Sequence, residues 1–297
     1  MSVHGSTTDH VDAARADTVV DRSTVSRVGA RPHLFRYIGQ LFTYRHFVLF
    51  DARARVAGSS TNDSLGRLWM VLNPILNGAT YFLVFGILLG TGRGIENFIG
   101  YLIIGVFMFR YTTSAVTSGS KSIVGNRAVI RAFSFPRATL PIAVNVRELL
   151  SNVPTFVMMF ILILMIPPAE DISWTWLLFF PVLALQFIMN LGLSLFLARM
   201  VARWNDVTHL IAFGTRAWLY ISAVFFSVER FEDTPLLIGL MHANPMFCVL
   251  DITRDALLYG GVGDPGRWLV LGGWALGSLV IGGIVFWQAE ETYGRAQ

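Results

Sequence analysis

The chain has 297 residues, of which 54% are hydrophobic and only 14% are charged. Soluble domains carry about 25% charged residues, so this composition indicates an integral membrane protein. The net charge of +4 does not indicate nucleic-acid binding, because the arginines alternate with long apolar segments. The single cysteine, Cys248, excludes a disulfide within the chain and a cysteine-based metal site.

The N-terminal part divides into a polar tail and an amphipathic segment. Residues 1–32 have no apolar run or periodicity, which predicts a disordered cytosolic tail without a cleavable signal peptide. Residues 33–57 place Leu, Ile and Phe at helical spacing, which predicts a helix lying in the membrane interface. Its cationic side chains are Arg36, Arg45, Arg53 and Arg55. The alternative is a soluble helix packed on a partner.

The rest of the chain predicts an all-α membrane domain over residues 66–288, followed by a polar cytosolic tail at 289–297. Six apolar segments are long enough to cross a hydrocarbon core of about 30 Å. They are residues 68–90, 98–118, 139–166, 174–199, 207–228 and 267–288. The last external loop holds two apolar segments within 234–260 that are too short to span, so we expect short re-entrant helices there.

The distribution of basic residues sets the expected orientation. With the N-terminus in the cytosol, 16 of the 23 Lys and Arg residues fall in cytosolic segments and four in external loops. The positive-inside rule therefore favours six spans with both termini cytosolic, in a multi-pass protein of the cytoplasmic membrane.

The sequence contains no catalytic signature. It has no phosphate-binding G-x-x-x-x-G-K-[ST] loop, no H-E-x-x-H, and no pair of histidines at metal-ligand spacing. We therefore expect no enzymatic activity, no metal and no cofactor on this chain. If the protein moves a substrate uphill, the energy must come from a partner or an ion gradient.

Two arginines fall in the middle of predicted spans, Arg110 and Arg216. An arginine near the bilayer centre costs about 2.5–3.5 kcal/mol on insertion scales, so such residues usually face a cavity or a partner. A cationic pair would suit an anionic substrate group such as a phosphate. The alternative is that they snorkel, or pair with Glu148 or with external acids.

The loop between the second and third spans is basic and contains no acid. Its middle predicts a two-turn helix with Val129, Ile130 and Phe133 on one side. Such a helix is either a docking contact for a partner or a segment bound to anionic lipid. The candidate contacts are Asn126, Arg127, Val129, Ile130, Arg131 and Phe133.

Several short motifs, in order along residues 33–293, resemble those of the Wzm-like permeases of ABC exporters for O-antigen and teichoic-acid polysaccharides. They are Leu65-Gly66-Arg67-Leu68-Trp69, Asn73-Pro74, Tyr81 with Val84-Phe85-Gly86, Asn126 with Phe135-Pro136-Arg137 and Leu140-Pro141, Arg203-Trp204-Asn205-Asp206-Val207, Asn244-Pro245, and Arg254 with Leu257-Leu258-Tyr259-Gly260. The chain is also similar to the actinobacterial branch that exports cell-wall galactan. Arg110 and Arg216 depart from the pattern, since the family usually has apolar or aromatic residues there.

The resemblance implies that two copies form a channel and that two copies of a separate ATPase subunit, carrying ATP and Mg, dock on the cytosolic side. The docking contacts would be the interface helix and the loop at 126–133. The substrate would be a polyprenyl-diphosphate-linked glycan, whose sugars could stack on Phe107, Phe109 and Tyr111. Membrane lipids would surround the complex, and the short external helices would cap the exit.

Three rival functions remain open on the sequence alone. A drug or lipid efflux permease of the same superfamily would also need an ATPase. A membrane scaffold subunit would need none. An ion-driven transporter would need buried acids in mid-span, and only Glu148 comes close to this position.

Overall fold

A computed structural model describes residues 33–58, 68–88, 90, 95–133, 135–168, 170–228 and 234–293. The predicted disordered tail, Arg67 and the last four residues lie outside this part of the chain. The described residues form helices connected by turns, without a strand. The all-helical class predicted from the sequence is therefore confirmed.

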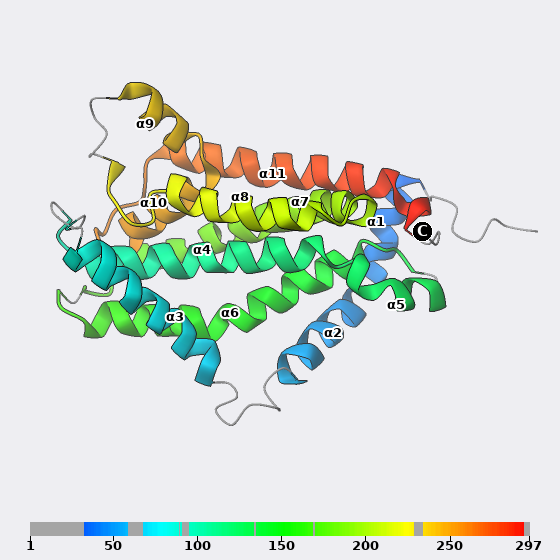
Figure 1. Cartoon of the computed structure of the whole chain (residues 1–297), viewed down its shortest axis with the longest axis horizontal. Helices are drawn as coiled ribbons and strands as arrows, with labels where there is room; N and C mark the ends of the chain where they lie inside the picture. The colour runs from blue at the N-terminus through cyan, green and yellow to red at the C-terminus, as the bar shows by residue number, and fades with distance from the viewer. Residues whose placement is uncertain are drawn as a thin grey trace, which may run out of the picture.

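Four long helices lie side by side along the long axis of the molecule (Figure 1). They are α4 (Phe98–Ser120), α6 (Thr139–Met165), α7 (Phe179–Arg203) and α11 (Pro265–Gln288). A 3₁₀ turn, η3 (Trp174–Leu178), leads into α7. Each of the four is long and apolar enough to cross a membrane, which supports a multi-pass membrane protein.

The other apolar helices are shorter. They are α3 (Leu68–Tyr81), the π-helical η1 (Phe82–Leu88), α8 (Val207–Ile221), α9 (Pro235–His242) and α10 (Pro245–Leu257). The α9 and α10 helices meet at 83° and count as a fifth span only if this bent pair is taken as one. Two short helices are thus present in the last predicted loop, while the count of six spans and the re-entrant path stay predictions.

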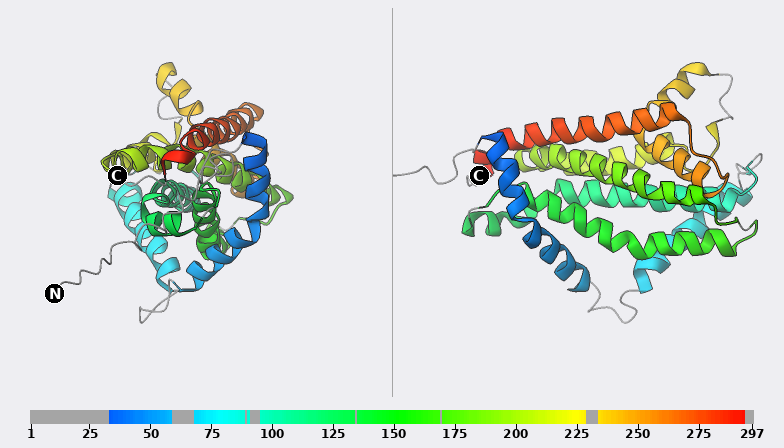
Figure 2. Two further views of the ribbon diagram at one scale, coloured as in Figure 1. Left: turned by 90° about the vertical axis from the view of Figure 1, so that its right-hand side faces the viewer. Right: turned by 180° about the vertical axis from the view of Figure 1, so that it is seen from behind.

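The remaining helices gather at one end of the bundle (Figures 1 and 2). They are α1 (Leu34–Thr43), α2 (Arg45–Gly58), η2 (Val124–Asn126), α5 (Arg127–Ala132) and η5 (Glu290–Thr292). We call this the basic end, because it carries Lys121, Arg127, Arg131, Arg137, Arg199 and Arg203. The α9 and α10 helices mark the opposite, distal end.

The amphipathic segment predicted as one helix over 33–57 is two helices broken at Tyr44. The two parts pack on different surfaces, which explains the break. Tyr37 of α1 is buried at the basic end, whereas α2 turns away to pack along α6, burying Val48 and Ala52.

Small and polar residues join the long helices. A Cβ atom on Gly282 of α11 would collide with the carbonyl oxygen of Gly192 in α7, so these two backbones are in direct contact. Between α7 and α4, the buried Gln186 amide donates to the Met108 carbonyl at 2.9 Å and to the Thr112 hydroxyl at 2.8 Å. These contacts join α11 to α7 and α7 to α4, whose inner face is part of the core of the bundle.

The predicted span at 207–228 ends early, because α8 stops at Ile221 and the chain turns into the core. Ala223 there has a positive φ of 51°, a conformation that costs an L-residue roughly 1–2 kcal/mol. The carbonyls freed from the helix accept hydrogen bonds from side chains of other helices. The Tyr101 hydroxyl donates to the Phe226 carbonyl at 2.7 Å. The Arg254 guanidinium donates to the carbonyls of Ala223 and Val224 at 3.2 and 3.3 Å. These bonds replace the helical ladder and allow the turn.

Candidate substrate groove and docking surfaces

A groove of about 500 Å³ runs between α3, α4 and α8, and it contains both of the arginines that the sequence predicted in mid-span. Arg110 extends from the centre of α4 and Arg216 from α8, and both side chains are exposed. The structure therefore places on one surface two residues that are 106 positions apart in the sequence.

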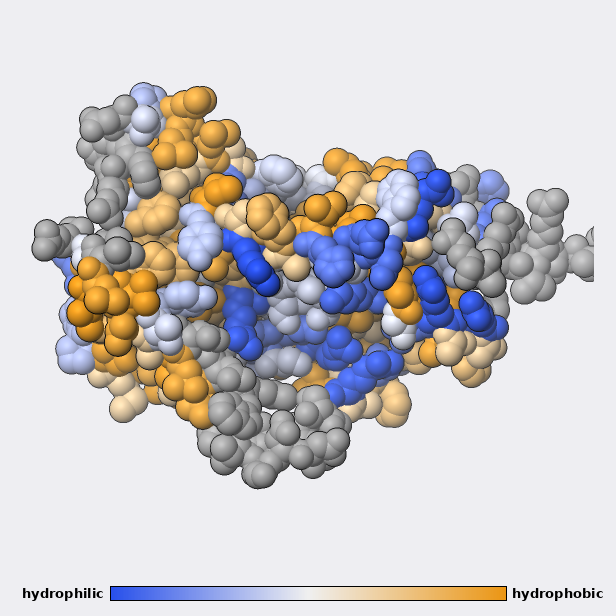
Figure 3. Space-filling view, in the orientation of Figure 1, coloured by the Kyte–Doolittle hydropathy of each residue, from blue (hydrophilic) through white to orange (hydrophobic). Residues whose placement is uncertain are grey.

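The α4 side of the groove carries a strip of hydroxyl groups at helical spacing, from Thr113, Ser114, Thr117 and Ser118. The other lining residues are Val106, Phe109 and Arg110 of α4, Thr215, Arg216 and Leu219 of α8, and Tyr81 of α3. Residues three and four apart share one helix face, so one side of α4 is polar along three turns. In the space-filling view, hydrophilic side chains gather across the middle of the face that carries α4 and α8 (Figure 3).

The groove arginines make no ion pair or hydrogen bond with the described residues. Glu148, the acid considered as their partner, is half-buried and engaged elsewhere. It accepts a short hydrogen bond from the Ser114 hydroxyl and pairs with Arg147 at 3.3 Å. The groove therefore presents positive charge that its own walls do not neutralise.

The three aromatic residues proposed to contact sugars separate into two groups. Phe109 lines the groove and meets Trp218 edge-on, with ring centroids 5.8 Å apart. Phe107 and Tyr111 lie on the other side of α4, where they are buried in the core and Tyr111 packs against Phe156. Of the three, Phe109 alone lines the groove, although it is itself buried.

This face cannot lie against lipid tails as it stands. Exposed guanidinium and hydroxyl groups on membrane-spanning helices are costly in hydrocarbon, so they face water, a substrate or another protein. The chemistry of the groove fits an anionic, hydroxyl-rich molecule, because guanidinium groups bind phosphates and hydroxyl groups pair with sugars.

The basic end carries the predicted docking helix. The helix expected around 126–133 is present as α5, preceded by the turn η2. Ile130 is buried and anchors it, Val129 is half-buried, and Phe133 is 68% exposed. The Asn126 amide donates to the Ser122 carbonyl at 2.7 Å, which closes the preceding turn. Arg127 and Arg131 are exposed, one turn apart on the same face.

The interface segment presents its arginines to the outside. Arg36, Arg45, Arg53 and Arg55 are all exposed, and Arg55 pairs with Asp51 at 2.9 Å within α2. Exposed large apolar side chains, among them Phe35, Phe42 and Phe50, accompany them. This mixture suits contact with a membrane surface or a protein partner.

A buried polar cluster fixes α1 to the bundle. The Tyr37 hydroxyl donates to Glu290 Oε2 at 2.8 Å and accepts from the Ala138 amide at 3.1 Å. The Arg137 amide donates to Glu290 Oε1 at 2.8 Å. Burial raises the pKa of Glu290 above its usual range, although these hydrogen bonds partly offset the effect. Sequence reasoning missed this cluster, because nothing local relates Tyr37 to Glu290.

Sequence reasoning also missed Arg254, which it counted among the external charges. The structure buries Arg254 completely in α10. Its guanidinium lies 3.3 Å from the centroid of the Tyr101 ring and donates to three backbone carbonyls. The Arg254 and Tyr101 side chains also form part of a polar pocket of about 630 Å³ at the distal end, with Asp251, Asp255 and Arg267.

Residues 54–258 match the family model for the ABC-2 type transporter. Because this match covers more than half of the 297 residues, the chain belongs to the ABC-2 type transporter family.

The relatives carry a more specific name. The O-antigen export system permease protein RfbA of Myxococcus xanthus is 25% identical over 228 residues, which cover 76% of this chain and 85% of the relative. A protein of the same name from Klebsiella pneumoniae is 23% identical over 200 residues, covering 67% and 75%. The resemblance to Wzm-like permeases seen in the sequence motifs is thereby confirmed.

Proposed function

We propose that this chain is the transmembrane subunit of an ATP-driven exporter that moves a polyprenyl-diphosphate-linked polysaccharide across the cytoplasmic membrane. The cargo we propose is the galactan of the cell wall. Two copies form the pathway, and each docks one copy of a separate ATPase subunit that binds ATP and Mg. The basic end and both termini face the cytosol, in keeping with the positive-inside rule.

The groove between α4 and α8 is the observation that carries the proposal. It joins two exposed arginines that pair with no acid among the described residues, a strip of hydroxyl groups, and the buried ring of Phe109 in the groove wall. A lipid-linked glycan has matching parts, since its diphosphate is anionic and its sugars present hydroxyl groups and apolar faces. A second copy covering this face would remove it from lipid and enclose the pathway.

The docking contacts we propose are at the basic end. The exposed Phe133 and the face of α5 around Val129 meet the ATPase, and α1 and α2 add contacts through Arg36, Arg45, Arg53 and Arg55. Because α1 is fixed to η5 and to the start of α6 through Tyr37 and Glu290, movement of an ATPase bound there would reach α6 directly.

Purification of the tagged protein from its own membranes in a mild detergent tests the class of transporter. We expect a stoichiometric ATPase with a nucleotide-binding loop to co-purify. If an intact dimer carries no ATPase, the exporter loses its energy source and the scaffold or ion-driven alternative takes precedence.

Depletion of the protein, followed by analysis of lipid-linked glycans, tests the cargo. We expect lipid-linked galactan to accumulate on the cytosolic side. Unchanged glycan together with increased sensitivity to drugs would instead indicate an efflux permease of the same family.

A further inference from the structure

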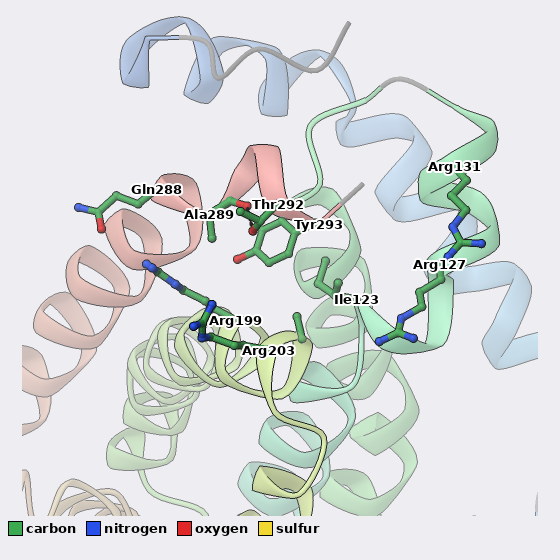
Figure 4. A pocket seen from close by; sticks show the side chains of 10 residues that line it. Ile123, Arg127, Arg131, Arg199, Arg203, Gln288, Ala289, Thr292 and Tyr293 are labelled. Carbon is green, nitrogen blue, oxygen red and sulfur yellow. Dashed lines mark hydrogen bonds between the residues drawn. The ribbon is translucent and has the colours of Figure 1, made fainter. Parts of the chain in front are cut away.

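A cationic pocket of about 290 Å³ lies at the basic end, apart from the α4–α8 groove (Figure 4). It is lined by Ile123, Arg127, Arg131, Arg199, Ala202, Arg203, Gln288, Ala289, Thr292 and Tyr293. Four of these residues are arginines and none is acidic. The pocket thus combines residues from α5, α7 and the C-terminal segment.

The arginines form two facing pairs. Arg199 and Arg203 lie one turn apart in the last turns of α7, and Arg127 and Arg131 lie one turn apart on α5. Figure 4 shows the two pairs on opposite sides of the pocket, with Ile123 and Tyr293 between them. A group that enters the pocket therefore meets guanidinium groups from both sides.

The α7 pair is held in position. The Arg199 guanidinium donates to the Val285 carbonyl of α11 at 2.6 Å, and the Arg203 guanidinium lies 5.1 Å from the centroid of the Trp204 ring. Each arginine keeps further N–H donors that these contacts do not use. Such fixed donors lose less conformational entropy when an anion binds.

Neither acid of η5, Glu290 or Glu291, lines the pocket. The Glu290 carboxylate accepts from the Tyr37 hydroxyl and the Arg137 amide, and neither of these residues lines the pocket. The hydroxyl groups of Tyr293 and Thr292 are also engaged, donating to the carbonyls of Phe286 and Ala289. Four positive charges therefore share a small space, and their repulsion falls when an anion enters.

We propose that this pocket binds a phosphate or diphosphate group. Guanidinium forks match phosphate oxygens and form short, charge-assisted hydrogen bonds. A small, partly enclosed cavity with donors on facing walls fits a compact anion better than an extended acidic polypeptide. The group can belong to an anionic membrane lipid or to a lipid carrier. The assignment to a lipid carrier rests on the proposed function, whereas the proposed affinity for phosphate does not.

The proposal gives the two sides of α5 different roles. Arg127 and Arg131 line the pocket, while Phe133 is exposed and does not line it, so it stays available for the proposed contact with the ATPase. A bound phosphate would bridge α5 to α7, and so connect the docking helix to the helix that packs on α11.

Calorimetry with the full-length permease in a neutral detergent tests the site, with inorganic pyrophosphate as the first probe. We expect the wild type to bind and the double variants Arg127→Gln/Arg131→Gln and Arg199→Gln/Arg203→Gln to bind at least about tenfold more weakly. Lys121→Gln removes an exposed cation at the same end that does not line the pocket, so it serves as the matched control and should retain wild-type affinity. Because Arg127 and Arg131 are exposed, their double variant stays informative even if the α7 variant does not fold.

Two further probes distinguish the sources. Farnesyl diphosphate that competes with pyrophosphate would indicate a lipid-carrier diphosphate. Phosphatidylglycerol retained from nanodiscs by the wild type, but lost in both double variants, would indicate a membrane lipid. Wild-type affinity in both double variants overturns the proposal. The proposal is also overturned if the wild type binds no phosphate probe and both double variants lose the ATPase subunit, because the pocket would then bind a protein partner.

Discussion

The Tyr37 hydroxyl donates a 2.8 Å hydrogen bond to Glu290 Oε2, joining the first described helix to the last across 253 positions of sequence. Glu290 also accepts from the Arg137 amide at the entrance to α6, and Tyr37 accepts from the Ala138 amide. Three segments that are distant in sequence thus meet at two buried side chains.

Removal of this hydroxyl should loosen α1. Tyr37→Phe leaves the buried Glu290 carboxyl without one donor, and a buried acceptor that loses its donor costs about 1–3 kcal/mol. We expect a lower melting temperature in detergent and faster proteolysis within residues 34–58. Tyr44→Phe changes the half-buried tyrosine at the α1–α2 break and is the control. Equal loss of stability in the two variants would show that the bond to Glu290 contributes nothing specific.

The same cluster predicts a pH dependence. Burial raises the pKa of Glu290 in the folded protein, so folding favours its protonated form. The contribution of the protonated Glu290 to the stability of the fold is therefore fully present below its unfolded-state pKa of about 4.5. This contribution is lost as the pH rises through the folded-state pKa of Glu290. Arg137, Tyr37 and Tyr293 are the titratable groups that act on it.

Glu290→Gln isolates this effect, because glutamine resembles the protonated acid and does not titrate. We expect the melting temperature of the wild type to fall relative to Glu290→Gln as the pH is raised from 4.5 through the folded-state pKa. A difference that stays constant across this range would show that Glu290 does not titrate as its burial requires.

The groove arginines should be needed for transport and not for assembly. Both Arg110 and Arg216 are exposed in the single chain, so neither supports the fold through buried contacts. We expect Arg110→Ala and Arg216→Ala each to reduce export at least about tenfold, because a guanidinium bond to a charged group is lost, while the complex with the ATPase still forms. Lys121→Gln is the control for a lost cation, and normal export by Arg110→Ala in cells depleted of wild type would contradict the assignment.

The contact between α7 and α11 should tolerate no side chain at Gly282. A valine there would collide with the Gly192 carbonyl, and such overpacking typically costs about 1–3 kcal/mol or more. Gly283→Val is the matched control, since a Cβ at Gly283 meets nothing within 4 Å. We expect Gly282→Val alone to lower the yield of monodisperse protein, and similar yields for the two variants would disprove the close contact.

The sequence predicted the helices better than their ends and contacts. The long apolar segments, now α4, α6, α7 and α11, were predictable because apolar length alone identifies them. The basic loop likewise predicted α5. The break at Tyr44 was not predictable, because no proline or glycine marks it and packing on two different surfaces causes it.

The candidate sites, like the helices, could be predicted only in part from the sequence. Arg110 and Arg216 were found because a charge inside an apolar segment is visible in the sequence, but their common groove depends on how α4 and α8 pack. The pocket formed by Arg127, Arg131, Arg199 and Arg203 could not be predicted, because each pair lies in an ordinary basic segment. The burial of Arg254 could not be predicted, because its partners are backbone carbonyls, which no sequence pattern reveals.

Arg254 should therefore be a structural residue. Its guanidinium satisfies the carbonyls of Tyr101, Ala223 and Val224, and it stabilises the turn in which Ala223 has a positive φ. Arg254→Met keeps much of the volume but removes every donor, leaving three buried acceptors with fewer partners at about 1–3 kcal/mol each. We expect little folded protein, measured as monodisperse yield and resistance to protease. Arg254→Lys keeps the charge without the planar fork, so it should recover only part of the yield. Arg53→Gln, at an exposed arginine of α2, should behave as wild type, and normal folding of Arg254→Met would show that the turn after α8 forms without the guanidinium.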